Sequence, residues 1–261
     1  MTAPETWTRY TRALPGAHDR LLCFPYAGGG AAAFRAWVGE LAASGTEVWP
    51  VQLPGRENRL GEPPVSDLPR LVAELADVFE DRLDELPYTL FGHSMGARVA
   101  FELAHELRRR DRPPPRLLIV SAHRPPHRLD PDPPAHALPR DRFLARLRTY
   151  GGVSEAVLAE PSLLDLMLPV VRADFALFER HPWQPEPLLG CPMTVLGGRT
   201  DARVPAAELT NWAELTEGPC ELRMFDGGHF FLAESPHQVV GAVRDAILRT
   251  REGTGHVGDM R

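Results

Sequence analysis

The 261-residue chain contains no lysine, so all 29 of its positively charged residues are arginine. This absence excludes mechanisms that need a lysine amine, namely Schiff-base formation, attachment of pyridoxal phosphate and the phosphate contact of a P-loop. Isoleucine is also nearly absent, whereas alanine, glycine, proline and arginine are abundant. We interpret this bias as a property of the coding sequence and not of the protein's chemistry.

Cysteine is scarce as well. The three cysteines, Cys23, Cys191 and Cys220, lie far apart, and no C-x-x-C pair indicates redox chemistry or a zinc site. Cys23 and Cys220 fall in segments that we expect to be buried strands, where a thiol packs as a small hydrophobic group. We therefore expect no metal and no cofactor.

The sequence also lacks long apolar runs and an excess of positive charge. No apolar segment approaches the ~20 residues that a membrane helix needs, and the first twenty residues lack the apolar core of a signal peptide. The net charge of −6 and the isoelectric point near 5.9 argue against a nucleic-acid-binding face. We expect a cytoplasmic monomer that binds neither membrane nor nucleic acid.

The most informative stretch is Gly92-His93-Ser94-Met95-Gly96, which matches G-x-S-x-G. In this motif the serine occupies a sharp turn between a strand and a helix, and small flanking residues allow the turn to close. The context fits, because an apolar run precedes the motif and apolar residues recur at helical spacing after it. We predict that Ser94 is a nucleophile. The alternative is a glycine-bracketed turn in which the serine is incidental.

Strands and helices are predicted to alternate along most of the chain. The predicted strands are 20–24, 47–53, 88–91, 116–122, 193–196 and 220–225, and the predicted helices include 66–86, 205–215 and 236–251. Such alternation is typical of a mainly parallel sheet with helices on both faces. The chain is long enough to bury one large core, so we expect one α/β domain with a frayed tail over 252–261.

The alternation breaks between two proline-rich segments, 124–139 and 182–192. Proline at this density is incompatible with sheet and typical of linkers. Between the two segments the apolar pattern is helical, with a short stretch at Val157 and Leu158 and a longer helix from about Pro161. We predict a helical lid insertion with one face on the sheet and one on a ligand. The predicted division is a first core part, 1–123, the lid, 124–190, and a second core part, 191–261.

Two more candidate residues are expected near Ser94, because sites in open parallel sheets form at the carboxyl ends of the strands. Asp201 and His229 each follow a predicted strand, and the order serine, aspartate, histidine is that of α/β-hydrolases. We assign His229 as the base that takes the serine proton and Asp201 as the acid that orients it. Asp226 is the alternative acid, although it stands only three residues from His229.

The glycine-rich segment 25–30 also follows a predicted strand. It does not match the dinucleotide pattern G-x-G-x-x-G, and no acidic residue ends the next strand. We interpret it as half of an oxyanion hole, in which the backbone N–H groups of Ala27 and Met95 act together. Beyond the next strand, the simplest interpretation of Arg56 and Glu57 is a surface ion pair.

Several motifs together resemble one family, the discrete type II thioesterases that accompany modular polyketide synthases and nonribosomal peptide synthetases. The similar segments follow the order of that family and are 23–29, 53–57, 91–97, 172–175, 197–201 and 227–231. The first two, Cys-Phe-Pro-Tyr-Ala-Gly-Gly and Leu-Pro-Gly-Arg-Glu, are much more specific than G-x-S-x-G. The chain departs from the family pattern at His181, where a tyrosine is expected.

The resemblance implies an α/β-hydrolase fold and hydrolysis of acyl groups from the phosphopantetheine arm of acyl or peptidyl carrier proteins, through an acyl-Ser94 intermediate. Such hydrolysis removes aberrant or stalled chains from the assembly line. Our candidates for contacting the substrate lie within the similar segments and are Tyr26, Gly28, Phe175 and Phe230.

The residues alone leave two alternatives open. One is a small-molecule carboxylesterase or lipase-like hydrolase with the same triad, and the other is a non-catalytic binding protein of the same fold. For the partner, four arginines of one segment predict a docking surface for an acidic carrier protein near the lid, and a solvated helix face is the alternative. These arginines are Arg140, Arg142, Arg146 and Arg148.

Overall fold

A single parallel sheet organises the chain, whose computed structural model describes residues 4–151 and 160–254. The strand order is β2-β1-β3-β4-β5-β6, and every neighbouring pair is parallel. The strands are β1 (Asp19–Phe24), β2 (Thr46–Pro50), β3 (Tyr88–His93), β4 (Leu117–Ser121), β5 (Met193–Gly198) and β6 (Cys220–Phe225). The predicted α/β fold with a parallel sheet is therefore confirmed.

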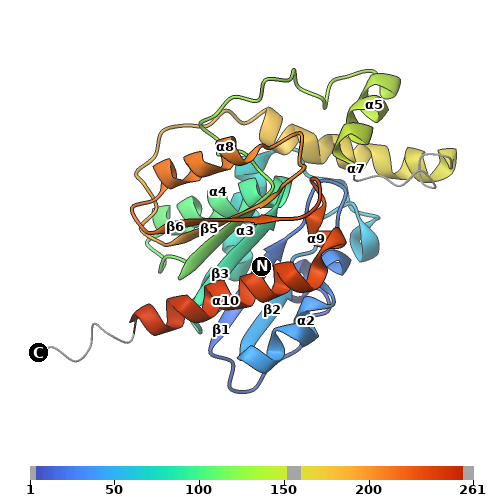
Figure 1. Ribbon diagram of the computed structural model, residues 1–261. Coiled ribbons are helices and arrows are strands. Elements are labelled where there is room, and N and C mark those ends of the chain that lie inside the picture. The colour runs from blue at the N-terminus through green and yellow to red at the C-terminus, as the bar shows by residue number, and fades with distance from the viewer. Residues whose placement is uncertain (1–3, 152–159, 255–261) are drawn as a thin grey trace, which may run out of the picture.

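Two apolar cores cover the two faces of the sheet, and Figure 1 shows helices on both sides of it. Helices α3 (Leu68–Leu83) and α4 (Met95–Arg109) pack on one face, and α2 (Trp37–Glu40) and α10 (Pro236–Thr254) on the other. Because side chains of a strand alternate between faces, Leu22 and Phe24 of β1 enter the first core and Leu21 and Cys23 the second. Burial on both faces explains why β1, β3, β4 and β5 are mainly apolar without alternation, whereas the partly buried strand β6 carries Glu221 and Arg223.

The remaining helices are short or belong to the insertion. They are α1 (Pro4–Trp7), α5 (Arg140–Tyr150), α7 (Pro161–Glu179), α8 (Ala206–Leu209) and α9 (Phe231–Glu234), with 3₁₀ turns at Ala31–Phe34, Ala42–Ser44, Glu57–Arg59 and Thr210–Leu215. Helices α5 and α7 stand between β4 and β5 in the chain and share a third apolar cluster, built around Phe143, Leu164 and Phe175. The predicted helical stretch at Val157 and Leu158 lies outside the described residues.

Some predicted boundaries are wrong. The strand 47–53 ends at Pro50, and the helix 66–86 begins only after Asp67, whose side chain caps it by accepting from Arg70 N. The helix 205–215 is one α-helical turn followed by a 3₁₀ turn, and the side chains of Thr210 and Asn211 bond to the Ala207 carbonyl there.

Two further expectations need correction or qualification. Helix α10 runs to Thr254, beyond the start of the predicted tail, and 255–261 lies outside the described residues. Cys23 is fully buried, but Cys220 is only partly buried because β6 is the edge strand of the sheet.

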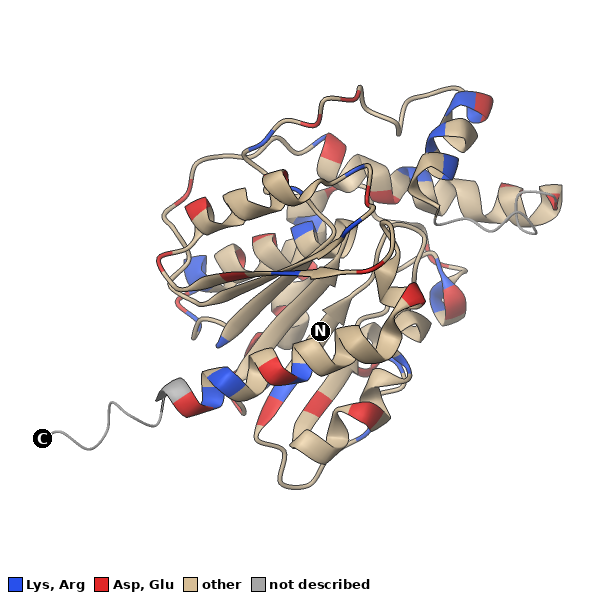
Figure 2. Cartoon of the chain, in the orientation of Figure 1, with Lys and Arg blue, Asp and Glu red and all other residues tan. Residues whose placement is uncertain are grey.

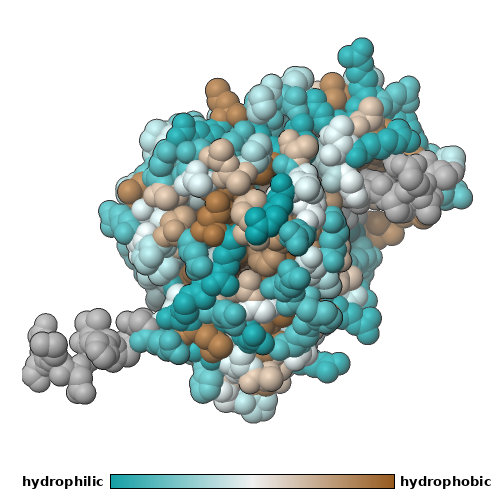
Figure 3. Space-filling model, viewed as in Figure 1, coloured by the Kyte–Doolittle hydropathy of each residue, from teal (hydrophilic) through white to brown (hydrophobic). Residues whose placement is uncertain are grey.

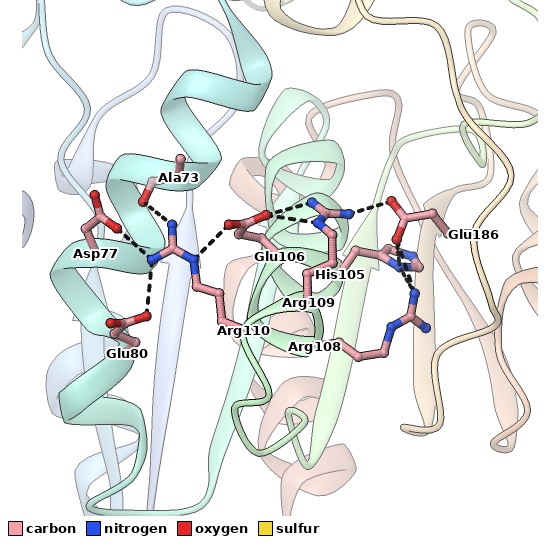
Figure 4. A network of polar contacts seen from close by, with 9 residues as sticks. All are labelled: Ala73, Asp77, Glu80, His105, Glu106, Arg108, Arg109, Arg110 and Glu186. Carbon is pink, nitrogen blue, oxygen red and sulfur yellow. Dashed lines mark hydrogen bonds and ion pairs between the residues drawn. The ribbon is translucent and has the colours of Figure 1, made fainter.

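A polar network fixes the segment that returns from the insertion to β5 (Figure 4). Glu186 of that segment pairs with Arg108 and Arg109 at the end of α4. The same carboxylate also contacts His105, whose Nδ1 lies 3.2 Å from Glu186 Oε2. Arg110 continues the network to two carboxylates of α3. These contacts hold the return segment against α4, which covers one face of the sheet.

Hydrophobic residues are scattered among hydrophilic ones on the face shown in Figure 3. Within residues 4–151 and 160–254, no helix combines the length and apolar character that crossing a bilayer requires.

Candidate active site

Ser94 occupies the turn between β3 and α4 with φ of 53° and ψ of −120°, a backbone conformation that L-residues rarely adopt. The two motif glycines make this turn possible. A Cβ on Gly92 would lie 2.0 Å from the Gly96 carbonyl oxygen, and one on Gly96 would lie 2.1 Å from the Phe24 carbonyl oxygen. The predicted sharp turn is therefore present, and its two glycines have no room for side chains.

Ser94, His229 and Asp201 form one line of hydrogen bonds. The distance from His229 Nε2 to Ser94 Oγ is 3.0 Å, and from His229 Nδ1 to Asp201 Oδ2 it is 2.8 Å. The loops after β5 and β6 bring these residues together, because Thr200 N donates to Gly227 O at 3.0 Å. This arrangement allows the imidazole to accept the serine proton while the carboxylate fixes its tautomer.

Asp201 is held in its ionised form. Burial is the largest influence and raises its pKa, but hydrogen bonds from His229 and from the backbone N–H groups of Arg203 and Val204 outweigh it, so the pKa lies below its ordinary value. The alternative acid, Asp226, is 87% exposed and pairs with Arg199. Asp226 therefore takes no part in this line of contacts.

A second histidine, His93, contacts the backbone of His229. Burial lowers its pKa to about 3, so its ring is neutral at pH 7. His93 Nε2 lies 3.1 Å from the His229 carbonyl oxygen and Nδ1 lies 2.8 Å from Ser121 Oγ. A carbonyl oxygen only accepts, so Nε2 carries the proton and Nδ1 accepts from the serine hydroxyl. Sequence reasoning placed His93 beside the nucleophile but missed this contact to the His229 backbone.

The two N–H groups predicted to bind an oxyanion belong to Met95, which follows Ser94 in the chain, and to Ala27. Met95 is the first residue of α4, where a helical N–H has no partner within the helix and the helix dipole favours negative charge. Ala27 lies on the loop after β1 and lines the same cavity as Ser94. The binding of an oxyanion by these two N–H groups stays a prediction.

A cavity of about 190 Å³ opens beside Ser94. All four predicted substrate contacts, Tyr26, Gly28, Phe175 and Phe230, line it. The insertion supplies most of its apolar wall, through Leu147, Tyr150, Met167, Val171, Phe175 and Phe178. The cavity therefore has the triad at one side and the apolar faces of α5 and α7 at another.

Sequence reasoning missed two residues that contact the triad region. The Tyr150 ring, at the end of α5, packs edge-on against the His229 ring with centroids 5.2 Å apart. The Arg203 guanidinium lies 4.9 Å from the Tyr150 ring centroid. The backbone N–H of Arg203 donates to Asp201 Oδ1. The proximity of Arg203 to Asp201 in sequence was an available signal, whereas nothing in the pattern of α5 singled out Tyr150.

The interpretation of Arg56 and Glu57 as a surface ion pair is wrong. Arg56 is buried and pairs instead with Asp174 of α7, and Glu57 accepts from Ala32 N at 3.1 Å. The reason is the path of the loop after β2, which folds over the glycine-rich loop after β1.

Basic residues gather on α5, as the blue segments of Figure 2 show, but the four arginines of the predicted docking surface differ in their surroundings. Arg140 and Arg146 each form an ion pair with a carboxylate of the chain. Arg142 and Arg148 are exposed and have no ion pair among the residues that the structure describes. Only the second pair is thus available to a partner's carboxylates without breaking a contact.

The chain was compared with known proteins. A sequence profile of the thioesterase domain family matches residues 19–247. "Linear gramicidin dehydrogenase LgrE" of Brevibacillus parabrevis is 36% identical over 98% of each chain, and "Thioesterase PikA5" of Streptomyces venezuelae is 37% identical over 94% of this chain and 86% of its own. The solved structure of the RedJ thioesterase from the prodiginine pathway in Streptomyces coelicolor superposes with a TM-score of 0.83 and is 38% identical, covering 89% of this chain and 92% of RedJ.

Proposed function

Since the chain belongs to the thioesterase domain family, we propose that it hydrolyses acyl thioesters carried on the phosphopantetheine arm of acyl or peptidyl carrier proteins. In this role it removes aberrant or stalled chains during polyketide or nonribosomal peptide biosynthesis. The observation that carries the proposal is the line of contacts from Ser94 through His229 to Asp201 beside a cavity with an apolar wall. The thioesterase names of PikA5 and RedJ support it.

The proposed reaction has two stages. His229 Nε2 takes the Ser94 proton as Oγ attacks the thioester carbon, and the resulting oxyanion accepts hydrogen bonds from the N–H groups of Met95 and Ala27. The tetrahedral intermediate expels the phosphopantetheine sulfur, which takes the proton from His229. A water molecule, deprotonated by His229, then attacks the acyl carbon, and His229 returns the proton to Ser94 Oγ as the carboxylic acid leaves. Each oxyanion donor is worth about 3 to 4 kcal/mol of barrier.

The reaction needs no metal and no resident cofactor in this proposal. The triad supplies the nucleophile, the base and the orienting acid, and the phosphopantetheine arm belongs to the partner. The geometry also favours acyl transfer over the oxidoreductase chemistry that the name of LgrE denotes, because a serine on a strained turn with a paired histidine is suited to covalent acyl catalysis.

Replacement of the nucleophile tests the proposal. Ser94→Ala should lower kcat for acyl-N-acetylcysteamine and acyl-carrier substrates by roughly 10⁶-fold, and it should abolish labelling by a fluorophosphonate probe. Ser66→Ala, at an exposed serine, is the matched control and should keep full activity. Thioester turnover that survives Ser94→Ala would overturn the proposed mechanism, and folded wild-type protein that resists the probe would favour a non-catalytic binding protein.

The choice between thioesterase and carboxylesterase needs a separate measurement. Oxygen esters and thioesters with the same acyl group should be compared through kcat/KM. We expect a clear preference for the thioester, and a preference for the oxygen ester would support the carboxylesterase or lipase-like alternative.

A further inference from the structure

The segment 52–57, which follows β2, encloses the loop that carries Ala27. Gln52 Oε1 accepts from Ala31 N at 3.0 Å, and Arg56 Nη1 donates to Gly29 O at 3.2 Å. Glu57 adds the contact to Ala32 N described above. The loop after β2 therefore holds the loop after β1 at three successive points.

Asp174 completes this enclosure from the insertion. Its Oδ2 accepts from Gly28 N at 2.7 Å, next to Ala27 in the chain. The same carboxylate receives two hydrogen bonds from Arg56, Nη1 to Oδ2 and Nη2 to Oδ1, both at 2.7 Å. Asp174 is 0% exposed and Arg56 6%. A buried, two-pronged pair of this kind fixes both position and orientation.

The hydrogen bonds of the loop leave the N–H of Ala27 without a protein acceptor. The N–H groups of Gly28, Gly29, Ala31 and Ala32 all have acceptors. Among the described residues, no acceptor serves the N–H of Tyr26, Ala27 or Gly30, and of these Tyr26 and Ala27 line the cavity with Ser94. The N–H of Ala27, the expected oxyanion donor, is thus unbonded, while the N–H groups of the two residues after it are bonded.

The loop cannot hold this shape by itself. Gly28 has φ of +77°, and a Cβ there would lie 2.9 Å from Val171 Cγ2 of α7. Glycine gives the required conformation but no stiffness, because its backbone has more accessible states than that of any other residue. External contacts therefore add to the order of the loop, and those from Arg56 and Asp174 act at Gly28 and Gly29, the two residues that follow Ala27.

We propose that Asp174 and Arg56 are positioning residues that aim the Ala27 N–H at the reacting carbonyl oxygen, so that helix α7 is a structural part of the oxyanion hole. This inference rests on the proposed function, since it needs an oxyanion to stabilise. A displacement of about 1 Å in such a group costs on the order of 100-fold in rate. The pair therefore acts on kcat through the loop, without touching substrate.

The test compares Asp174→Asn and Arg56→Lys with the wild type. Each should lower kcat about 100-fold and change KM less than about threefold. Each should also weaken binding of an acyl trifluoromethyl ketone, whose adduct with Ser94 carries an oxyanion, by about 100-fold. Glu102→Gln, which breaks the buried pair between Arg98 and Glu102 on α4, is the matched control and should leave both values near wild type.

A purely structural role predicts a different pattern. It lowers the melting temperature and reduces the fraction of active sites, but it leaves kcat per active site and the affinity for the ketone unchanged. That result in folded Arg56→Lys would overturn the proposal, even if Asp174→Asn does not fold. Binding of the ketone does not depend on whether the enzyme prefers thioesters. Wild-type affinity for the ketone in the variants would therefore refute the positioning role of Asp174 and Arg56 and leave the proposed function untouched. Absence of thioester turnover in a wild type that binds the ketone refutes only the proposed function.

Discussion

Lowering the pH from 7 to 5 should remove a large part of the protein's stability through three histidines. Burial lowers the pKa of His93 and that of His123 to about 3 and the pKa of His105 to about 4, from an ordinary value of 6.5. The carboxylate of Glu186 faces His105 and partly offsets the effect of burial, while Arg108 and Arg109 oppose protonation (Figure 4). All three rings are therefore neutral in the folded protein at pH 5.

The sign and size follow from proton binding. At pH 5 the unfolded chain protonates all three histidines and the folded chain none of them, so stability falls as the pH drops below 6.5 and stops falling near the folded pKa values. Each histidine then contributes a loss of about 2 kcal/mol between pH 7 and pH 5, and the three together about 6 kcal/mol. A typical domain has only about 5 to 15 kcal/mol to lose. Carboxylates with lowered pKa values, such as Asp201, act mainly below pH 5.

Urea unfolding at pH 7, 6 and 5 at constant ionic strength measures this loss. His105→Gln should reduce the fall between pH 7 and 5 by about 2 kcal/mol relative to wild type, whatever it costs at pH 7. His237→Gln is the control, since that side chain is 88% exposed and should leave the fall unchanged. An identical pH dependence in His105→Gln and wild type would refute the reasoning.

Two further predictions concern specificity. Arg142→Glu combined with Arg148→Glu should raise KM for an acyl-carrier substrate about tenfold and leave acyl-N-acetylcysteamine turnover unchanged, because exposed charges act on encounter with the partner. Arg70→Glu on α3 is the control. An equal effect of the double variant and the control on KM would refute the predicted docking surface. Met167→Ala should lengthen the preferred acyl chain, with a gain in kcat/KM of up to about fourfold per added methylene, because each buried CH₂ is worth about 0.8 kcal/mol. An unchanged chain-length profile would exclude Met167 from the acyl-binding wall.

The parts of the structure that sequence predicted are those with local signals. Continuous apolar runs marked the strands, and the glycines at 92 and 96 marked the turn at Ser94, because a side chain at either position collides with backbone. The positions of Asp201 and His229 followed from a rule about parallel strands, and the structure brings both to within hydrogen-bond distance of their expected partners. Each inference needed only a short window of residues.

The parts that sequence reasoning missed depend on contacts between distant segments. Arg56 and Asp174 are 118 residues apart in the chain, and neither lies in a local pattern that indicates a buried partner. Charged residues in a loop are usually exposed, so the surface interpretation of Arg56 followed the ordinary preference and failed. The contact between Tyr150 and His229 is of the same kind, since it depends on how α5 sits over the sheet.

Helix α7 joins substrate selection to catalysis, and this has a consequence for engineering the pocket. Met167, Val171 and Phe175 face the cavity, while Asp174, adjacent to Phe175, bonds to the loop that carries Ala27. A substitution that widens the cavity near residues 171–175 also shifts the backbone of Asp174, because cores of this density transmit strain. Met167 lies two turns away from Asp174, so changes there should alter chain-length preference with the least effect on kcat for short acyl groups.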